Sequence, residues 1–238
     1  MKVAGAVAEV HSLFDSTRDY CKDYLTEETP EFTITVTAEN LAFEQADLLA
    51  EAKAEGMKPR KFTDPFLDRA AIQRAFADFL LNRNTLLFHG STVALDGFAY
   101  LFTAKCGTGK STHTRFWREM FGHRAVMIND DKPFLALTDR GAVAFGSPWS
   151  GKHGLDANIS APLAGICILE RGPENKIWPI SAPEALEMLR KQSYCPMDLA
   201  LQAAFEDLTA SLAQTVPLWR MTCAKDPQAA QVAYGAMS

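Results

Sequence analysis

The chain has 238 residues, of which 47% are hydrophobic and 22% are charged, and its formal net charge is −5. These values are typical of a globular protein with a substantial core, and the negative balance excludes a general electrostatic attraction to nucleic acid or anionic membranes. No apolar run approaches the roughly 20 residues that span a bilayer. We therefore expect neither nucleic acid nor a membrane among the partners.

The N-terminus and the cysteines indicate a compartment. The first twenty residues resemble a strand more than a signal peptide. The cysteines show no C-x-x-C spacing, and their odd number argues against a disulfide framework. They are Cys21, Cys106, Cys167, Cys195 and Cys223. A reducing cytoplasm is the expected location.

The N-terminal third of the chain alternates strand and helix signals. Residues 1–10 and 32–37 are predicted to be strands. Residues 38–56 are rich in Ala, Leu and Glu and are predicted to form a helix that stops at Gly56. A second helix begins at Asp64, with proline at its first position. Apolar residues are expected to form one buried face of this second helix: Phe66, Ile72, Phe76, Phe79 and Leu80.

A change in the sequence pattern after the second helix suggests a domain boundary. From Thr85 onward the chain is dense in strands, glycines and turn motifs. We place a soft boundary near residue 84, without a flexible linker. A small α+β portion, residues 1–84, is therefore expected to pack on a larger domain, residues 85–238.

Two hairpins flank a glycine-rich loop in the larger domain. Asp96-Gly97 between apolar alternations predicts the first hairpin, and Asp139 to Gly141 turns the second. A doubly wound parallel sheet would alternate strands and helices instead, so we predict an α/β fold with a mixed sheet. The remaining predicted strands are residues 98–103, 124–130, 161–172 and 216–224. The predicted helices are residues 111–121, 183–194, 197–215 and a last one from residue 226.

The loop in FTAKCGTGKSTHTRFW nearly fits the phosphate-binding pattern G-x-x-x-x-G-K-[ST]. Ala104 stands where the pattern has its first glycine, while Gly109, Lys110 and Ser111 match. Such loops bind phosphates through successive backbone N–H groups at the start of a helix, with a lysine on the β and γ oxygens and a hydroxyl on magnesium. The alternative is an ordinary glycine-rich turn between a strand and a helix.

Two acids follow the loop by about twenty residues. Asp130 and Asp131 end an apolar strand, where one could bind magnesium and the other could act as a base. The alternative is a turn with two solvated aspartates. His89, which ends an earlier strand, could tune proton transfer if it pairs with Asp130. In the glycine-rich turn GSPWSGKHG, Lys152 could stabilise charge on a transferring phosphoryl group, or simply face solvent.

Four motifs in order carry a family resemblance. FHGSTVALDGFAYLFTAKCGTGKSTHTRFW, NDD, GSPWSGK and PLAGICILERG resemble the catalytic domain of HPr kinase/phosphorylase. They are more similar still to a bacterial branch of HPr kinase-like, phosphoenolpyruvate carboxykinase-like P-loop proteins, which reads A-x-x-G-T-G-K-S-T in the loop. The resemblance is strong over residues 85–180. It implies the mixed-sheet carboxykinase-like P-loop fold, distinct from the parallel Ras-like one, and it implies ATP with Mg²⁺.

The resemblance also implies roles for individual residues. His89 with Asp130 would form the acid–base pair, and Ser111 with Asp131 would hold the metal, although the order of the two acids stays open. Lys152 would assist catalysis. The phosphates would be bound by Ala104, Lys105, Cys106, Gly107, Thr108, Gly109, Lys110, Ser111 and Thr112.

Some family features are absent. The R-G-x-G element of HPr kinases is missing, and PWSGK stands near its place, which puts HPr in doubt as the substrate. The N-terminal segment has no clear likeness to the HPr kinase regulatory domain, and residues for oxaloacetate are not found. We expect an ATP-dependent kinase that acts on a serine of a small protein or peptide, or on a small-molecule alcohol such as serine. The alternatives are a nucleotide hydrolase or switch and a non-catalytic ATP-binding module, and the resemblance also allows a homo-oligomer.

Overall fold

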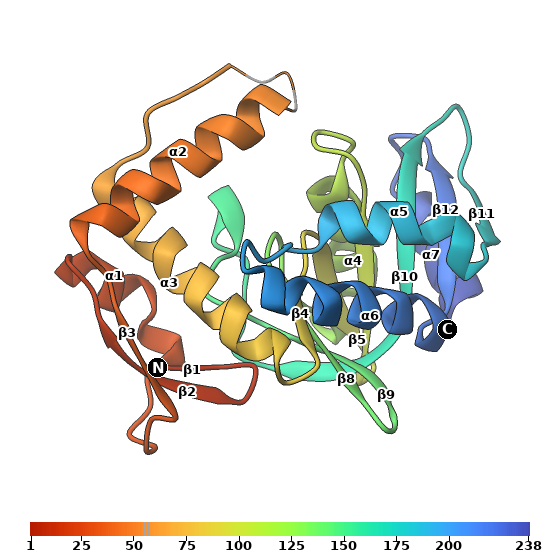
Figure 1. Ribbon diagram of the computed structural model, residues 1–238. Coiled ribbons are helices and arrows are strands. Elements are labelled where there is room, and N and C mark those ends of the chain that lie inside the picture. Colours follow the sequence, from red (N-terminus) through yellow and green to blue (C-terminus); the bar gives the residue numbers. More distant parts are fainter. Residues whose placement is uncertain (55, 57) are drawn as a thin grey trace. The chain divides into compact units, whose positions relative to one another are not determined.

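The chain divides into two compact units, residues 1–79 and 80–238. Figure 1 shows the elements of this computed structural model. The structure describes residues 1–54, 56 and 58–238. The division falls inside one helix, α3 (Asp64–Leu81), whereas the boundary drawn from the sequence, near residue 84, lies just beyond that helix.

The smaller unit contains a three-stranded sheet in the order β1-β2-β3. β1 and β2 are antiparallel, and β2 and β3 are parallel. The single strand predicted over residues 1–10 is wrong, because the chain reverses at Ala4 and Gly5, whose φ values are 47° and 85°. The predicted strand at residues 32–37 ends at Thr35. The strands are Lys2–Val3, Ala6–His11 and Phe32–Thr35.

Helices complete the smaller unit. α1 (Asp15–Tyr20) and a short 3₁₀ helix at Lys22–Tyr24 were not predicted from the sequence. α2 (Ala38–Ala54) agrees with the predicted helix at its start. Its predicted end at Gly56 follows residue 55, which lies outside the described residues.

The predicted buried face of α3 is correct except at its start. Phe79 stacks on Phe32 of β3, with the ring centroids 3.8 Å apart. Phe66 is 38% exposed, so its predicted burial is wrong; Leu67 is buried instead. The neighbouring residue points about 100° away around a helix, which is enough to exchange a buried for an exposed position. The predicted residues that are fully buried are Ile72, Phe76 and Leu80.

The larger unit contains a nine-stranded mixed sheet. The strand order is β4-β8-β9-β10-β6-β5-β7, and β12 and then β11 branch from β10. β10 is parallel to β6 and β12, while β6 is antiparallel to β5. The mixed α/β class is therefore confirmed, although β11 was not predicted. The strands are β4 (Thr85–Leu87), β5 (Ser91–Leu95), β6 (Phe98–Thr103), β7 (Ala125–Asn129), β8 (Phe134–Thr138), β9 (Gly141–Phe145), β10 (Ser160–Arg171), β11 (Lys176–Pro179) and β12 (Leu218–Cys223).

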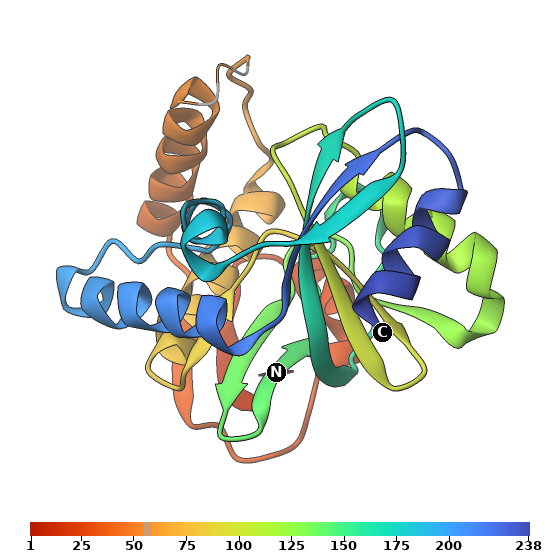
Figure 2. The ribbon, with the colours of Figure 1, turned by 90° about the vertical axis from the view of Figure 1, so that its right-hand side faces the viewer.

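Helices cover both faces of this sheet (Figure 2). α4 packs with α7 on one face, and α5 packs with α6 on the other. β6 lies between the two layers, so Leu101 joins the core with Phe205 of α6, while Phe102 joins the core with Trp117 of α4. A strand buried on both faces needs a continuous apolar run, which is what β6 has. The helices are α4 (Lys110–Phe121), α5 (Ala182–Gln192), α6 (Leu199–Thr215) and α7 (Gln228–Met237).

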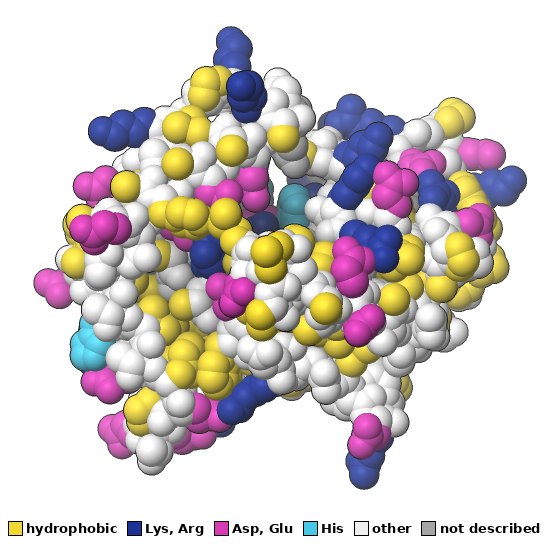
Figure 3. Space-filling model, viewed as in Figure 1, with side chains coloured by type: hydrophobic (Ala, Val, Ile, Leu, Met, Phe, Trp, Pro, Cys, Tyr) yellow, Lys and Arg dark blue, Asp and Glu magenta, His cyan; other side chains and the backbone are white. Residues whose placement is uncertain are grey.

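The surface carries charges of both signs. On the face shown in Figure 3, basic and acidic side chains are interspersed, with hydrophobic side chains scattered between them. Within the described residues, no helix combines the length and the apolar character needed to cross a bilayer.

Candidate functional site

The loop after β6 begins with a buried alanine. Ala104 is fully buried in the core that includes Trp117. The described non-glycine residues with positive φ are Ala4, Asn84 and Asp96, so Ala104 has an ordinary backbone conformation. Nothing at this position requires glycine, which explains why alanine can stand in place of the first glycine of the phosphate-loop pattern.

Two glycines shape the loop. Gly107 and Gly109 have φ values of 75° and 122°. A Cβ on Gly107 would meet no atom within 4 Å, so the backbone conformation rather than crowding requires glycine there. Gly109 precedes α4 and offers no side chain to cap the helix. The first amides of α4 therefore stay available to an anion, which the helix dipole also favours.

Arg171, at the end of β10, contacts this loop from one side. Its Nη2 donates a hydrogen bond to the carbonyl of Gly107, and its Nε lies 3.5 Å from the carbonyl oxygen of Thr108. The guanidinium thus holds the loop and adds positive charge beside it. Sequence reasoning missed Arg171, because β10 and the loop are far apart in the chain.

Lys110 connects the loop to the two acids. Its Nζ donates to the carbonyl oxygen of Ala104 at 3.3 Å. Burial lowers the pKa of Lys110, and the negative charges of Asp131 and Asp130 oppose that shift. The structure therefore brings the predicted lysine and both predicted carboxylates within electrostatic reach of one another.

Asp130 is held by a chain of hydroxyls. Asp130 is only 7% exposed, and the Oγ of Ser91 donates to its Oδ1 at 2.6 Å. The same Oγ lies 2.7 Å from Oγ1 of Thr114. Because Ser91 gives its single proton to the carboxylate, Thr114 must be the donor to Ser91. This chain links α4 through β5 to the end of β7. Sequence reasoning missed both hydroxyls, because Ser91, Thr114 and Asp130 are far apart in the chain.

His89 contacts Asp131 and not Asp130, so the predicted pairing is corrected. Nε2 of His89 lies 3.3 Å from Oδ1 of Asp131. Burial, with the positive charges of Lys132 and Lys110, lowers the pKa of His89 to about 3. Burial also raises the pKa of Asp131. The imidazole is therefore neutral near pH 7, and its 3.3 Å contact with Asp131 is not an ion pair.

Asn129 fixes the turn that carries both acids. Its Oδ1 accepts hydrogen bonds from the backbone N–H groups of Asp131 at 2.8 Å and Lys132 at 2.6 Å. Its Nδ2 donates to the carbonyl oxygen of Ser147 at 2.7 Å. Both ends of one buried amide are thus used, and the turn is joined to the segment GSPWSGKHG.

That segment approaches Asp131 through a glycine. A Cβ on Gly151 would lie 3.2 Å from the Cβ of Asp131. The next residue, Lys152, is exposed and has no hydrogen bond or ion pair among the described residues. The ammonium group of Lys152 therefore belongs to the residue that follows Gly151, whose backbone lies close to Asp131.

The other predicted phosphate and metal residues lie at the loop surface. Lys105 and Cys106 are exposed, whereas Thr108, Ser111 and Thr112 are half-buried. Across the described part of the chain, no group of three or more His, Cys, Asp or Glu side chains could hold a metal ion. Mg²⁺ is compatible, because it usually takes only one or two carboxylates and completes its shell with phosphates and water.

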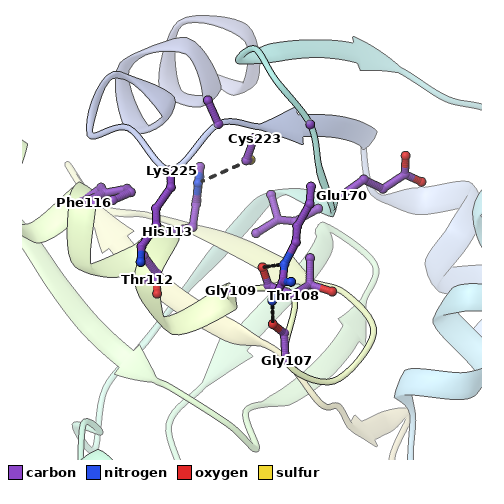
Figure 4. Close-up of a pocket in the computed structure, with 13 residues that line it drawn as sticks. Gly107, Thr108, Gly109, Thr112, His113, Phe116, Glu170, Cys223 and Lys225 are labelled. Atoms are coloured by element: carbon purple, nitrogen blue, oxygen red, sulfur yellow. Dashed lines mark hydrogen bonds between the residues drawn. The ribbon is translucent and has the colours of Figure 1, made fainter.

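A cleft of about 520 Å³ opens on the Arg171 side of the loop (Figure 4). It is lined by residues 107–109 of the loop, the first turns of α4, residues 169–172 and residues 223–225. Its described lining includes none of the residues of the charged cluster, namely Lys110, Asp130 and Asp131. The cleft and the charged cluster are thus distinct regions that share the loop.

Comparison with known proteins adds little to this geometry. No protein-family model and no curated protein matches the sequence. Among solved structures, the chain is similar to the Hpr(Ser) kinase/phosphatase from Coxiella burnetii, with 11% identity, a TM-score of 0.37, and coverage of 63% of this chain and 89% of that one. A TM-score of this size does not establish a shared fold.

Proposed function

We propose that this chain is an ATP-dependent kinase that transfers the γ-phosphoryl group to a hydroxyl. The acceptor would be a serine of a small protein or peptide, or a small-molecule alcohol such as free serine. One observation carries the proposal: Lys110, at the start of α4, interacts electrostatically with two carboxylates, one of which contacts a neutral histidine. Catalysis of phosphoryl transfer rests on positioning, charge stabilisation and a proton acceptor. The lysine can stabilise charge, one carboxylate can accept the proton, and the histidine can position that carboxylate.

We also propose the phosphoenolpyruvate carboxykinase-like P-loop class for the larger unit. The support is the environment of β6, which leads into the loop. It is antiparallel to β5 and parallel to β10. A parallel Ras-like P-loop domain would not have the antiparallel neighbour.

The loop is suited to the phosphates of ATP. Gly107 and Gly109 leave the loop backbone open, and the first turn of α4 offers its amides. The hydrogen bond from Lys110 to Ala104 is long, at 3.3 Å, so a phosphate oxygen can readily replace the carbonyl. Ser111 and Asp130 offer the oxygen ligands that Mg²⁺ prefers. When bound, Mg²⁺ would offset charge on the β and γ phosphates.

The family resemblance implies that Asp130 belongs to the acid–base pair and that Asp131 holds the metal. The contacts favour the opposite assignment. Asp131 has a side chain that is 33% exposed, has a raised pKa and lies 3.3 Å from Nε2 of His89, which suits a general base. Asp130 is buried and held by Ser91, which suits a fixed ligand. The acceptor hydroxyl would lose its proton to Asp131 while its oxygen bonds to the γ phosphorus and the bond to ADP breaks. His89 would orient Asp131, and Lys110 with Lys152 would offset developing charge.

The test is transfer from [γ-³²P]ATP in the presence of Mg²⁺. Acceptors are offered in parallel: buffer alone, free L-serine, seryl peptides and a lysate of the source organism. We expect label in one of the acceptor arms, and we expect Asp131→Asn to abolish it. Asp139→Asn is the matched control, because Asp139 is exposed in the β8–β9 turn and should transfer normally.

Other results would reject the proposal in distinct ways. Release of phosphate in buffer, with no labelled acceptor in any arm, identifies a hydrolase. Calorimetry that shows no heat with ATP·Mg²⁺ rejects the phosphate loop itself. Binding of ATP without hydrolysis or transfer in any arm identifies a binding module.

A further inference from the structure

We propose that the cleft beside Arg171 binds the nucleoside part of the nucleotide, base and ribose, while the loop binds the phosphates. This inference rests on the proposed function and extends it to residues that no motif assigns. The cleft shares Gly107, Thr108 and Gly109 with the loop. A ligand whose phosphates lie on the loop therefore has direct access to the cleft.

The orientation of a bound nucleotide follows from which residues lie on each side of the loop. The charged cluster contains Lys110 and Asp131, and the described lining of the cleft includes neither. The transferring phosphate must lie near Lys110 and the base. The opposite end of the phosphate chain, which carries the nucleoside, then points toward the cleft.

The inner wall of the cleft is electrically neutral. The indole Nε1 of Trp117 donates to Nε2 of His113 at 3.2 Å, so a neutral imidazole carries its proton on Nδ1. That Nδ1 lies 3.9 Å from the Sγ of Cys223 (Figure 4). Burial lowers the pKa of His113 to about 3 and raises the pKa of Cys223 to about 11. This part of the wall, His113 with Cys223, gives a phosphate no countercharge, whereas it suits an uncharged heterocycle; the charged lining residues are Glu170, Arg171 and Lys225.

The remaining lining has the mixture that a nucleoside needs. Phe116 and Leu169 are apolar and buried, and Lys225 is exposed. In Figure 4 the side chain of Lys225 extends toward Thr112. The apolar surface can cover a ring, while the polar groups can reach ribose hydroxyls. A volume of about 520 Å³ also lies within the range of roughly 300–1,000 Å³ for small-molecule pockets.

The wall is rigid enough to preserve this shape. The backbone N–H of Ala224 donates to Oδ1 of Asn175 at 2.9 Å, and the N–H of Gly172 donates to the carbonyl of Cys223 at 3.1 Å. A larger side chain at Ala224 therefore occupies the cleft and does not simply push the wall aside. Ala224 keeps its backbone hydrogen bond in any such variant.

The experiment separates nucleoside from phosphate by calorimetry with two probes, ATP and inorganic tripolyphosphate, each with Mg²⁺. In the unmodified protein we expect ATP to bind at least about tenfold more tightly than tripolyphosphate. Ala224→Trp should weaken ATP binding at least about tenfold and change tripolyphosphate binding less than about twofold. Gln228→Trp is the matched control, since Gln228 is exposed and does not line the cleft; it should change neither. Circular dichroism checks folding, and Ala224→Leu replaces the first variant if that one unfolds.

The outcomes separate this inference from the proposed function. If ATP binding survives both Ala224 substitutions, the nucleoside lies elsewhere and the inference fails alone. If ATP and tripolyphosphate weaken equally in a folded variant, the cleft binds phosphate and the inference also fails. If the unmodified protein binds neither probe, the phosphate loop fails, and the proposed function falls together with the inference.

Discussion

The two sides of one loop differ in the titratable side chains that they present. On one side Lys110 faces Asp130 and Asp131. On the other side His113 and Cys223 are held in their neutral forms. Burial disfavours every charge, so charges are stabilised only where opposite charges or hydroxyl donors surround them.

The two histidines sharpen this contrast. Burial lowers the pKa of both His89 and His113 to about 3. At His89 two lysines add to that effect, whereas at His113 burial acts alone. His89 is thereby a neutral neighbour of Asp131, and His113 a neutral part of the cleft wall. The same neutral state therefore occurs beside a carboxylate on one side and beside a thiol on the other.

The largest expected effect separates the two acids. Asp131→Asn keeps the shape but cannot accept a proton, so phosphoryl transfer should fall by about 10²–10⁴-fold with ATP·Mg²⁺ affinity little changed. Asp130→Asn should instead raise the Mg²⁺ concentration needed for half-maximal rate, because an amide is a poorer ligand for a hard cation. Transfer rates and Mg²⁺ titrations of both variants check this. Normal transfer by Asp131→Asn with loss in Asp130→Asn would restore the order implied by the family resemblance.

Removal of the lysine should affect the charged side alone. Lys110→Ala should lower kcat/KM by about 10²–10³-fold, comparable to loss of one preorganised donor to transition-state charge. It should weaken ATP and tripolyphosphate alike, in contrast to substitutions in the cleft. Lys176→Ala, at an exposed lysine of β11 outside the loop and the cleft, is the control. Equal losses in the two variants would mean that general positive charge, and not the position of Lys110, is responsible.

The hydroxyl chain should contribute less. Ser91→Ala removes a hydrogen bond to a buried carboxylate, worth about 1.5–3 kcal/mol, so the free energy of unfolding should fall by that amount. Ser193→Ala provides the comparison, because Ser193 is also buried but donates only to the neutral carbonyl of Leu189, at 2.9 Å. Denaturant unfolding of both variants measures the difference. A smaller loss at Ser91 than at Ser193 would show that the chain does not stabilise Asp130.

A further expected effect is the pH dependence of stability that arises from His113. The folded pKa of His113, about 3, lies below the unfolded value near 6.5, so the unfolded state binds more protons between these values. The buried neutral His113 contributes its full share to the free energy of unfolding above pH 6.5. This contribution is lost as the pH falls toward 3, by at most about 1.4 kcal/mol per pH unit. His113→Gln should flatten this slope between pH 7 and 5, while His153→Gln, at an exposed site, should not. Unfolding curves at several pH values test this, and an unchanged slope in His113→Gln contradicts it.

Local patterns determined much of the larger unit. The hairpin signal at Asp96-Gly97 and the apolar run of β6 depend on neighbouring residues only, and both predicted the mixed sheet correctly. The loop between β6 and α4 was located by the same kind of local signal. Failures in the smaller unit were also local: a turn at Ala4 and Gly5 split one predicted strand, and Phe66 was placed one residue out of phase with the buried face.

Which side chains contact one another became known only from the tertiary structure. Asp130 and Asp131 are adjacent in the sequence, yet the turn held by Asn129 directs one to Ser91 and the other to His89. Arg171 reaches the loop from the end of β10, and the cleft is assembled from segments far apart in the chain. The position of the loop and the residue types around it could be predicted from the sequence alone. The reason is that backbone conformation and strand pairing at a hairpin depend on short-range interactions. Partners and protonation states depend on burial and on long-range contacts, so they became visible only once the sheet was assembled.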